Sequence, residues 1–272
     1  MAELPRLITF DGEARSGKGT IVQAIKDMLR DELGYKTMLI DAGQVFRCLV
    51  VAAADAGINL EDPAAIDAFL SDEQSAHKCV EFVKQVYRMD KDQRDALLYT
   101  NEVGANSAKI GARPLSQSFK DDLLRKWLHD AGEEGYEIVL LDGRALEEIG
   151  LWLQGEMLCD FVMGLYFVCD PAVGARRTLG FAGTQYADLK PEERAQVDEL
   201  VTQINARNAA DSKRAVQPIV RPTGAPVFVL PDVTQFSPVE GLYMATVDTS
   251  GNMTKEEMSQ PIASIIARQL GN

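Results

Sequence analysis

A glycine-rich segment between an apolar strand and a helix constrains the fold of this chain more than any other stretch. Residues 7–10 are mostly apolar, and residues 12–20 follow with the pattern G-x-x-x-x-G-K-G-T. The three glycines allow positive φ angles and leave room for several backbone N–H groups to point inward. The helix expected to begin near Lys18 adds the positive end of its dipole. The segment therefore predicts a loop that binds a chain of phosphates.

Two side chains of this loop have expected roles. Lys18 can reach the outer phosphates as a point charge, and the Thr20 hydroxyl can donate to an inner phosphate. Gly19 stands where many such loops carry the Ser or Thr that binds magnesium directly, so we expect a metal ion to be held more through water. The alternative interpretation is a glycine turn that only joins a strand to a helix.

Short apolar strands alternate with amphipathic helices along the rest of the chain. This alternation predicts an α/β fold, a three-layer parallel sheet with helices on both faces. The expected strands are 7–10, 36–41, 137–142, 163–170 and, last, 243–248 or 226–230. We favour 243–248, which makes 226–242 an inserted loop. The expected helices are one after the glycine loop, then 44–56, 114–131, one opening at Pro171, 191–211 and 255–270.

Ligands of parallel sheets bind at the carboxyl ends of the strands. Three expected strands end in Asp11, Asp41 and Asp142, so the candidate chemistry converges on one edge of the sheet. Residues 59–100 are charged and helical in pattern, and we interpret them as an insertion.

The net charge of −13 argues against duplex nucleic acid as a partner, because binding there depends on neutralising phosphates. No run of about 18 apolar residues occurs, and no basic stretch precedes an apolar segment at the N-terminus. We therefore expect a cytoplasmic protein without a membrane partner. The four scattered cysteines, which lack C-x-x-C spacing, are expected to be buried free thiols.

Five blocks of the sequence resemble the cytidylate kinases, a family of P-loop nucleoside monophosphate kinases. The most specific block is R-x-x-x-D-x-x-R at 207–214, followed by the tail A-V-Q-P. The blocks occur in the family's order: residues 8–20, D-A-G-Q-V-F-R at 41–47, D-G-R at 142–144, A-R-R at 175–177 and residues 207–216. The resemblance implies transfer of the ATP γ-phosphoryl group to a nucleoside monophosphate, CMP or dCMP first of all, with Mg²⁺ as cofactor.

The resemblance also implies the roles of individual residues. The ATP-binding set is Gly12, Ser16, Gly17, Lys18, Gly19, Thr20 and the lid residues Arg176 and Arg177. The acceptor-binding set is Asp41, Arg47, Arg144, Arg207, Asp211 and Arg214. The catalytic set is Lys18, Arg144, Arg207, Arg214 and Arg176, and Asp142 is expected to orient magnesium-bound water.

Three of these assignments have simpler alternatives. Asp211 is spaced to form intrahelical ion pairs with Arg207 and Arg214. Arg176 and Arg177 fit an ordinary solvated helix face, and Asp142 fits a helix cap.

The resemblance further implies a P-loop kinase core, 1–58 and 101–272, with a lid at about 171–190 and a helical subdomain at 59–100 on the acceptor side. A monomer is expected, with ATP and a nucleoside monophosphate as partners. Departures from the family pattern lie where the base is read: Ala42, Ala145 and Asn208 replace the usual residues, Ser107 is adjacent to Ala108, and no Arg stands at Gln117 or Lys120. Two other hypotheses therefore remain, a kinase for another nucleotide or small-molecule acceptor and a catalytically silent ATP-binding regulatory protein.

Overall fold

The computed structural model describes residues 3–214, 217–232 and 243–270. The chain forms two compact units, one of residues 1–40 with 130–272 and one of residues 41–129. We call them the sheet unit and the helical unit.

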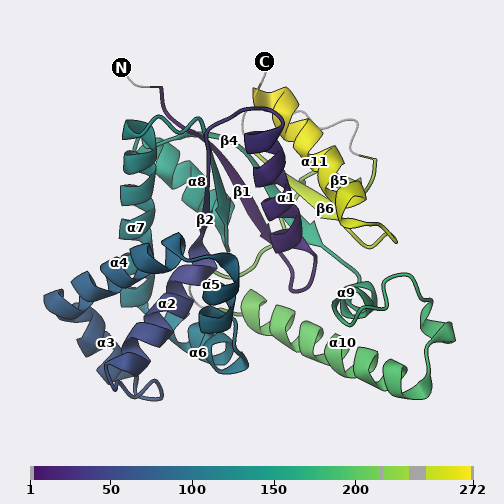
Figure 1. Cartoon of the computed structure of the whole chain (residues 1–272), viewed down its shortest axis with the longest axis horizontal. Helices are drawn as coiled ribbons and strands as arrows, with labels where there is room; N and C mark the ends of the chain where they lie inside the picture. Colours follow the sequence, from purple (N-terminus) through teal and green to yellow (C-terminus); the bar gives the residue numbers. More distant parts are fainter. Residues whose placement is uncertain (1–2, 215–216, 233–242, 271–272) are drawn as a thin grey trace. The chain divides into compact units, whose positions relative to one another are not determined.

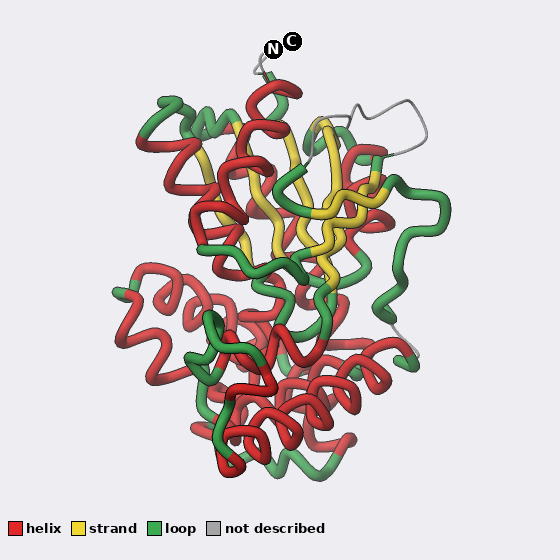
Figure 2. Tube along the Cα trace, turned by 90° about the vertical axis from the view of Figure 1, so that its right-hand side faces the viewer, coloured by secondary structure: helices red, strands yellow, loops and turns green. Residues whose placement is uncertain are grey.

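The sheet has six strands in the order β2-β3-β1-β4-β6-β5. Strand β1 pairs in parallel with β3 and β4, and β6 pairs in parallel with β4 and β5. Figure 2 shows the strands running side by side. This confirms the predicted α/β class. The strands are β1 (Arg6–Gly12), β2 (Thr37–Asp41), β3 (Ile138–Asp142), β4 (Asp160–Val168), β5 (Val227–Val229) and β6 (Met244–Asp248).

Helices α1 (Lys18–Asp31) and α11 (Lys255–Leu270) lie together on one face of the sheet (Figure 1). Phe10 of β1 and Phe167 of β4 are fully buried in the same core, with ring centroids 6.3 Å apart. Helix α8 (Leu146–Gly155) packs against β1 and β4. Its Gly150 is in close contact with the Phe161 ring, because a Cβ there would lie only 3.0 Å from it. Helix α1 packs against β1 and β3, and the glycine loop joins β1 to α1.

Two further helices of the sheet unit belong to the predicted lid region and the segment after it. Helix α9 (Pro171–Thr178) packs against α10 (Pro191–Ser212) through Ala175, Val197 and Ile204. A short 3₁₀ helix, η1 (Tyr186–Asp188), lies between them. Both α9 and α10 begin with proline at the first helical position, where the missing N–H costs no hydrogen bond.

The helical unit contains five whole helices and most of α7 (Pro114–Glu133), up to residue 129. The helical pattern predicted for residues 59–100 is confirmed, and all three helices there begin after an Asp whose carboxylate accepts from the first turn. Whether 59–100 is a subdomain of its own stays a prediction. The five whole helices are α2 (Ala42–Asp55), α3 (Pro63–Ser71), α4 (Glu73–Arg88), α5 (Lys91–Leu98) and α6 (Asn101–Gly111).

The predicted loop at 226–242 is wrong at its start, because residues 227–229 form β5. Both candidate strands exist, and 243–248 supplies the last one, β6. Strand β5 is a three-residue edge strand with two exposed side chains, which is too short to show a clear apolar pattern. Residues 233–242 lie outside the described residues. All four cysteines are buried and free, as predicted.

Candidate active site

The glycine loop, residues 12–20, links β1 to α1 in a conformation that needs two of its glycines. Gly12 has φ 147°, and a Cβ there would overlap the backbone of Phe167. Gly17 has φ 83° and forms the left-handed N-cap of α1, where no side chain caps the helix. The start of α1 is therefore left for a ligand to cap.

The hydrogen bonds of this loop divide its backbone N–H groups into two sets. Glu13 donates to the Phe167 carbonyl (2.8 Å), and Ala14 donates to Oδ1 of Asn208 (2.8 Å). The described residues offer no acceptor to the N–H groups of Arg15, Gly17, Gly19 or Thr20. These four donors make the loop complementary to phosphate oxygens.

Ser16 has a structural part in the loop. It is 1% exposed, and its hydroxyl donates to the Glu13 carbonyl (2.9 Å). Its own carbonyl accepts from the hydroxyl of Thr249 (2.8 Å), which follows β6. The loop is therefore fixed from two directions before any ligand binds.

Lys18 forms an ion pair with Asp142, the last residue of β3. Both side chains are about seven-eighths buried, with 13% exposed. Asp142 is not a helix cap, because α8 has Ala145 at its N-cap in a left-handed conformation without a side-chain hydrogen bond. That alternative is wrong, and the Asp142 carboxylate lies beside the Lys18 ammonium group at the start of α1.

Three arginines surround the carboxylate of Asp211, which is 3% exposed near the end of α10. An Nη2 of Arg214 lies 2.5 Å from Oδ1, and Nη2 of Arg144 lies 3.7 Å from Oδ2. Arg207 is more exposed, with its Nε 3.8 Å from Oδ2. The predicted intrahelical spacing thus produces ion pairs, and Arg144 joins them from the end of β3. We call these four residues the Asp211 cluster.

The second oxygen of Asp211, Oδ2, has no hydrogen bond in the part of the chain that the structure describes. A buried carboxylate oxygen without a donor is costly, so this atom is suited to accept from a ligand hydroxyl. The cluster therefore combines three guanidinium groups with a carboxylate oxygen that accepts no hydrogen bond among the described residues.

Asp11 also faces Arg144. It is 3% exposed, its Oδ1 accepts from the N–H of Gly12 (2.6 Å), and Nη1 of Arg144 lies 3.8 Å from the same oxygen. Burial raises the pKa of Asp11, while the Arg144 guanidinium and the Gly12 N–H act in the opposite direction. Arg144 is thus held between two buried carboxylates, Asp11 and Asp211.

Arg176 and Arg177 bind main-chain carbonyls. Arg176 donates to the Thr184 carbonyl (2.7 Å), and Arg177 donates to the carbonyls of Thr249 (2.6 Å) and Gly251. Among the described residues neither guanidinium contacts a member of the Asp211 cluster or the glycine loop. Their role over ATP stays a prediction.

Asp41 and Arg47 belong to the helical unit and are brought together there by Tyr99. Oδ1 of Asp41 accepts from the N–H of Gln44 and so caps α2, and Oδ2 accepts from the Tyr99 hydroxyl (3.2 Å). The Arg47 guanidinium lies over the Tyr99 ring, 4.5 Å from its centroid, and donates to the Leu98 carbonyl (2.8 Å).

The positions aligned with base reading carry few free polar groups. The Ser107 hydroxyl donates to the carbonyl of Gly104 (2.8 Å), and Lys120, 1% exposed, pairs with Asp121. Gln117 differs: its Nε2 donates to the Gly111 carbonyl, whereas its buried Oε1 has no donor among the described residues.

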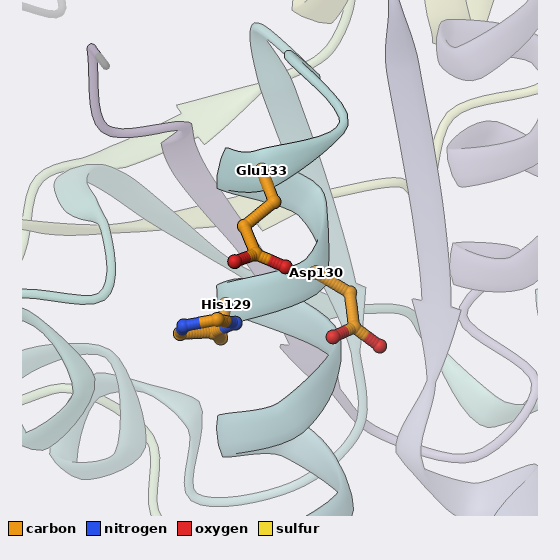
Figure 3. A group of neighbouring side chains, drawn as sticks. All are labelled: His129, Asp130 and Glu133. Atoms are coloured by element: carbon orange, nitrogen blue, oxygen red, sulfur yellow. The ribbon is translucent and has the colours of Figure 1, made fainter.

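Asp142 is a hard oxygen donor next to the loop that faces phosphate, so it fits a magnesium ion held through water. A second group of metal-binding side chains lies on α7: His129, Asp130 and Glu133, whose candidate ligand atoms are within 4.8 Å of one another (Figure 3). This group is on the surface of one helix, and exposed acidic groups of this kind are common without an ion. We assign it no function.

Four residues without a role in the sequence motifs make contacts in these sites: Asp11, Tyr99, Asn208 and Thr249. Asp11 had a signal, because it ends β1 at the ligand edge of the sheet. The other three act through contacts across 58 to 233 residues of sequence, which no local pattern indicates.

None of the described helices has the length and apolar character needed to cross a membrane.

The chain is similar to curated cytidylate kinases. The relative from Azotobacter vinelandii is 26% identical over 230 residues, which cover 80% of this chain and 85% of that protein. The relative from Pseudomonas entomophila is 25% identical over 226 residues, covering 80% and 86%. A solved structure described as a putative kinase from Chloroflexus aurantiacus aligns over 98% of this chain and 99% of that chain, with 14% identity and a TM-score of 0.40. That likeness is too weak to support an inference.

The family model for cytidylate kinase matches residues 8–237, which include the glycine loop and the Asp211 cluster. The chain therefore belongs to the cytidylate kinase family and is a nucleoside monophosphate kinase.

Proposed function

We propose that the protein transfers the γ-phosphoryl group of ATP to CMP or dCMP, giving ADP and the nucleoside diphosphate. The observation that carries the proposal is the Asp211 cluster, in which three arginines meet one buried carboxylate, and one oxygen of this carboxylate accepts no hydrogen bond among the described residues. Such a site can bind a phosphate and a sugar hydroxyl of one ligand. A site for ATP alone would not need it.

In this proposal the donor and acceptor phosphates have separate partners. The four free N–H groups of the glycine loop and the Lys18 ammonium hold the phosphates of ATP. Arg144 and Arg214 contact the acceptor phosphate and the transferring group with planar guanidinium groups that can bind two oxygens at once.

The reaction needs positioning and charge stabilisation more than a general base. An acceptor phosphate is mostly dianionic near neutral pH, since its second pKa is about 6. One of its oxygens attacks the γ-phosphorus of ATP while the bond to the bridging oxygen breaks and ADP leaves. Arginines lower the barrier because negative charge spreads over the transferring oxygens. Magnesium bound with ATP supplies further neutralisation, and Asp142 would hold its water.

The buried Oε1 of Gln117 supports an acceptor base with an amino group. This oxygen accepts but cannot donate, so it complements the exocyclic amino group of cytosine and not the corresponding carbonyl of uracil. A site built around such an atom discriminates strongly between the two.

The proposal is tested by a coupled ADP-release assay with CMP, dCMP, UMP, AMP, GMP and shikimate as acceptors. We expect the highest kcat/KM with CMP or dCMP. Gln117→Leu should lower discrimination between CMP and UMP, and Gln93→Leu, on exposed α5, is the control. ATP turnover that no nucleoside monophosphate stimulates would contradict the proposal.

A second candidate is the same transfer to another acceptor. The alanines at 42 and 145, where the family pattern has polar residues, favour it, because they remove hydrogen-bonding groups from the positions that read the base. Faster turnover of AMP, GMP or shikimate than of CMP in the same assay would establish this candidate.

A further inference from the structure

Arg47 has an unusual combination of partners in the helical unit. One guanidinium N–H donates to the Leu98 carbonyl, and the Tyr99 ring lies under its plane. On α6, a Cβ at Gly104 would lie 3.6 Å from Nη1 and 3.9 Å from Nη2, so the helix backbone passes close by. These contacts fix the guanidinium without using up its hydrogen-bond donors.

The donors that remain on Arg47 have no acceptor among the described residues. A half-buried guanidinium with several unused N–H groups and no carboxylate partner is prepared for an anion. This distinguishes Arg47 from Arg144 and Arg214, which are paired with carboxylates.

Tyr99 contacts the Arg47 guanidinium and Asp41 at the same time. Its ring contacts Arg47, and its hydroxyl donates to Oδ2 of Asp41, the residue that caps α2. Burial, followed by the negative charge of Asp41, raises the pKa of Tyr99, so the hydroxyl stays protonated and able to donate. The side chain is nonetheless 47% exposed, so it contributes little to the core.

We propose that Tyr99 is a positioning residue of the acceptor site, which orients Arg47 toward the acceptor phosphate and Asp41 beside it. The proposal rests on the proposed function, because it takes the nucleoside monophosphate as the anion that Arg47 binds. It adds a residue from the connection between α5 and α6, outside the blocks that resemble the family.

The first test is steady-state kinetics of Tyr99→Leu and Tyr99→Phe with CMP and ATP. Tyr99→Leu removes both contacts and should raise the KM for CMP about 10-fold, with kcat and the KM for ATP within about twofold of the original protein. Tyr99→Phe keeps the ring and should raise the KM for CMP only about threefold. This graded rescue is not expected from a residue that only stabilises the fold.

The matched control is Tyr136→Leu in the sheet unit, because Tyr136 also has a cation over its ring, Lys36 at 4.6 Å. It should leave both KM values unchanged. Thermal melts of all variants check that they fold.

A double-mutant comparison tests whether Tyr99 acts through Arg47. In the Arg47→Ala background, Tyr99→Leu should cause little further change in the KM for CMP, because the group that it positions is gone. Fully multiplicative effects would overturn the proposal.

Equilibrium binding of CMP, measured by calorimetry, distinguishes failure of the role of Tyr99 from failure of the proposed function. Turnover and binding of CMP by the original protein, with no change in Tyr99→Leu, would overturn the role of Tyr99 alone. An original protein that neither binds nor phosphorylates any nucleoside monophosphate would overturn the proposed function and this inference together.

Discussion

The sheet unit and the helical unit both contain a group suited to phosphate, but they prepare it in different ways. In the sheet unit the glycine loop offers four backbone N–H groups, whose positions are set by Gly12 and Gly17. In the helical unit a single side chain, Arg47, is held by an aromatic ring and a carbonyl.

The two phosphate-binding groups should respond differently to amino-acid substitutions. Backbone donors fixed between a strand and a helix lose little entropy when a ligand binds, and side-chain substitutions at positions other than Gly12 and Gly17 leave them in place. A guanidinium held by one ring depends on that ring. We therefore expect the donor site to tolerate changes in its surroundings and the acceptor site to be tuned by individual substitutions.

The largest expected effect comes from Lys18, whose ammonium group adds a positive charge beside the backbone N–H groups of the glycine loop. Lys18→Ala should reduce ATP-dependent turnover by more than about 10³-fold, because the charge facing the outer phosphates is lost. The coupled ADP-release assay measures it. Arg30→Ala, at an exposed position of the same helix, is the control and should keep full activity. Substantial activity in folded Lys18→Ala would show that the backbone N–H groups suffice.

Substitutions in the Asp211 cluster should reduce turnover almost as much as Lys18→Ala. Arg214→Ala is expected to lower kcat about 10³-fold if Arg214 stabilises the transferring phosphoryl group. Arg214→Lys keeps the charge but not the planar pair of donors and should recover only part of this loss. Unchanged kcat in a folded Arg214→Ala protein would remove the cluster from the mechanism.

The raised pKa of Asp11 in the sheet unit should make the stability of the protein depend on pH. Because burial raises its pKa, the folded protein retains a proton above about pH 4 that the unfolded chain has already released. This contribution to the free energy of unfolding is present at low pH and is lost as the pH rises through the folded-state pKa. Asn does not ionise, so the stability of Asp11→Asn relative to the original protein should increase as the pH rises from about pH 4 toward neutral. Urea titrations across this range measure the difference, and parallel curves would contradict it.

The smallest expected effects concern the buried thiols, which report on each unit separately. Burial raises the pKa of Cys48 to about 12 and that of Cys79 to about 11, both in the helical unit. Cys169 lies in the sheet unit near Arg177. We expect native protein to react slowly with a thiol reagent at pH 8. CMP should slow labelling of Cys48 about threefold and ATP that of Cys169, as measured by mass spectrometry. Equal protection of both thiols by either ligand would contradict separate sites.

The sequence predicts the local geometry of the sheet unit well because that geometry depends on short spacings. The glycine spacing requires the turn at Gly17, and the spacing of Arg207, Asp211 and Arg214 brings them to one helix face. The position of Arg144 between Asp11 and Asp211 depends on the pairing of β1 with β3, which a single sequence does not show.

Contacts between residues far apart in the sequence are less predictable for the same physical reason. Arg47 is found from its motif, but the ring that holds it lies 52 residues later in an insertion with only helical periodicity. Likewise Asn208, at a position where the family usually has Asp, gave no hint that its amide oxygen would accept from Ala14 in the glycine loop. Such contacts are set by tertiary packing and leave no periodic pattern.

The most direct test of the account is equilibrium binding of ATP and of CMP to Lys18→Ala and Arg47→Ala. We predict that Lys18→Ala raises the Kd for ATP at least about 10-fold and leaves the Kd for CMP unchanged. Arg47→Ala should raise the Kd for CMP at least about 10-fold and leave the Kd for ATP unchanged. If both variants weaken the binding of the same ligand, or if Arg47→Ala leaves the Kd for CMP unchanged, the division into a backbone donor site and an Arg47 acceptor site is contradicted.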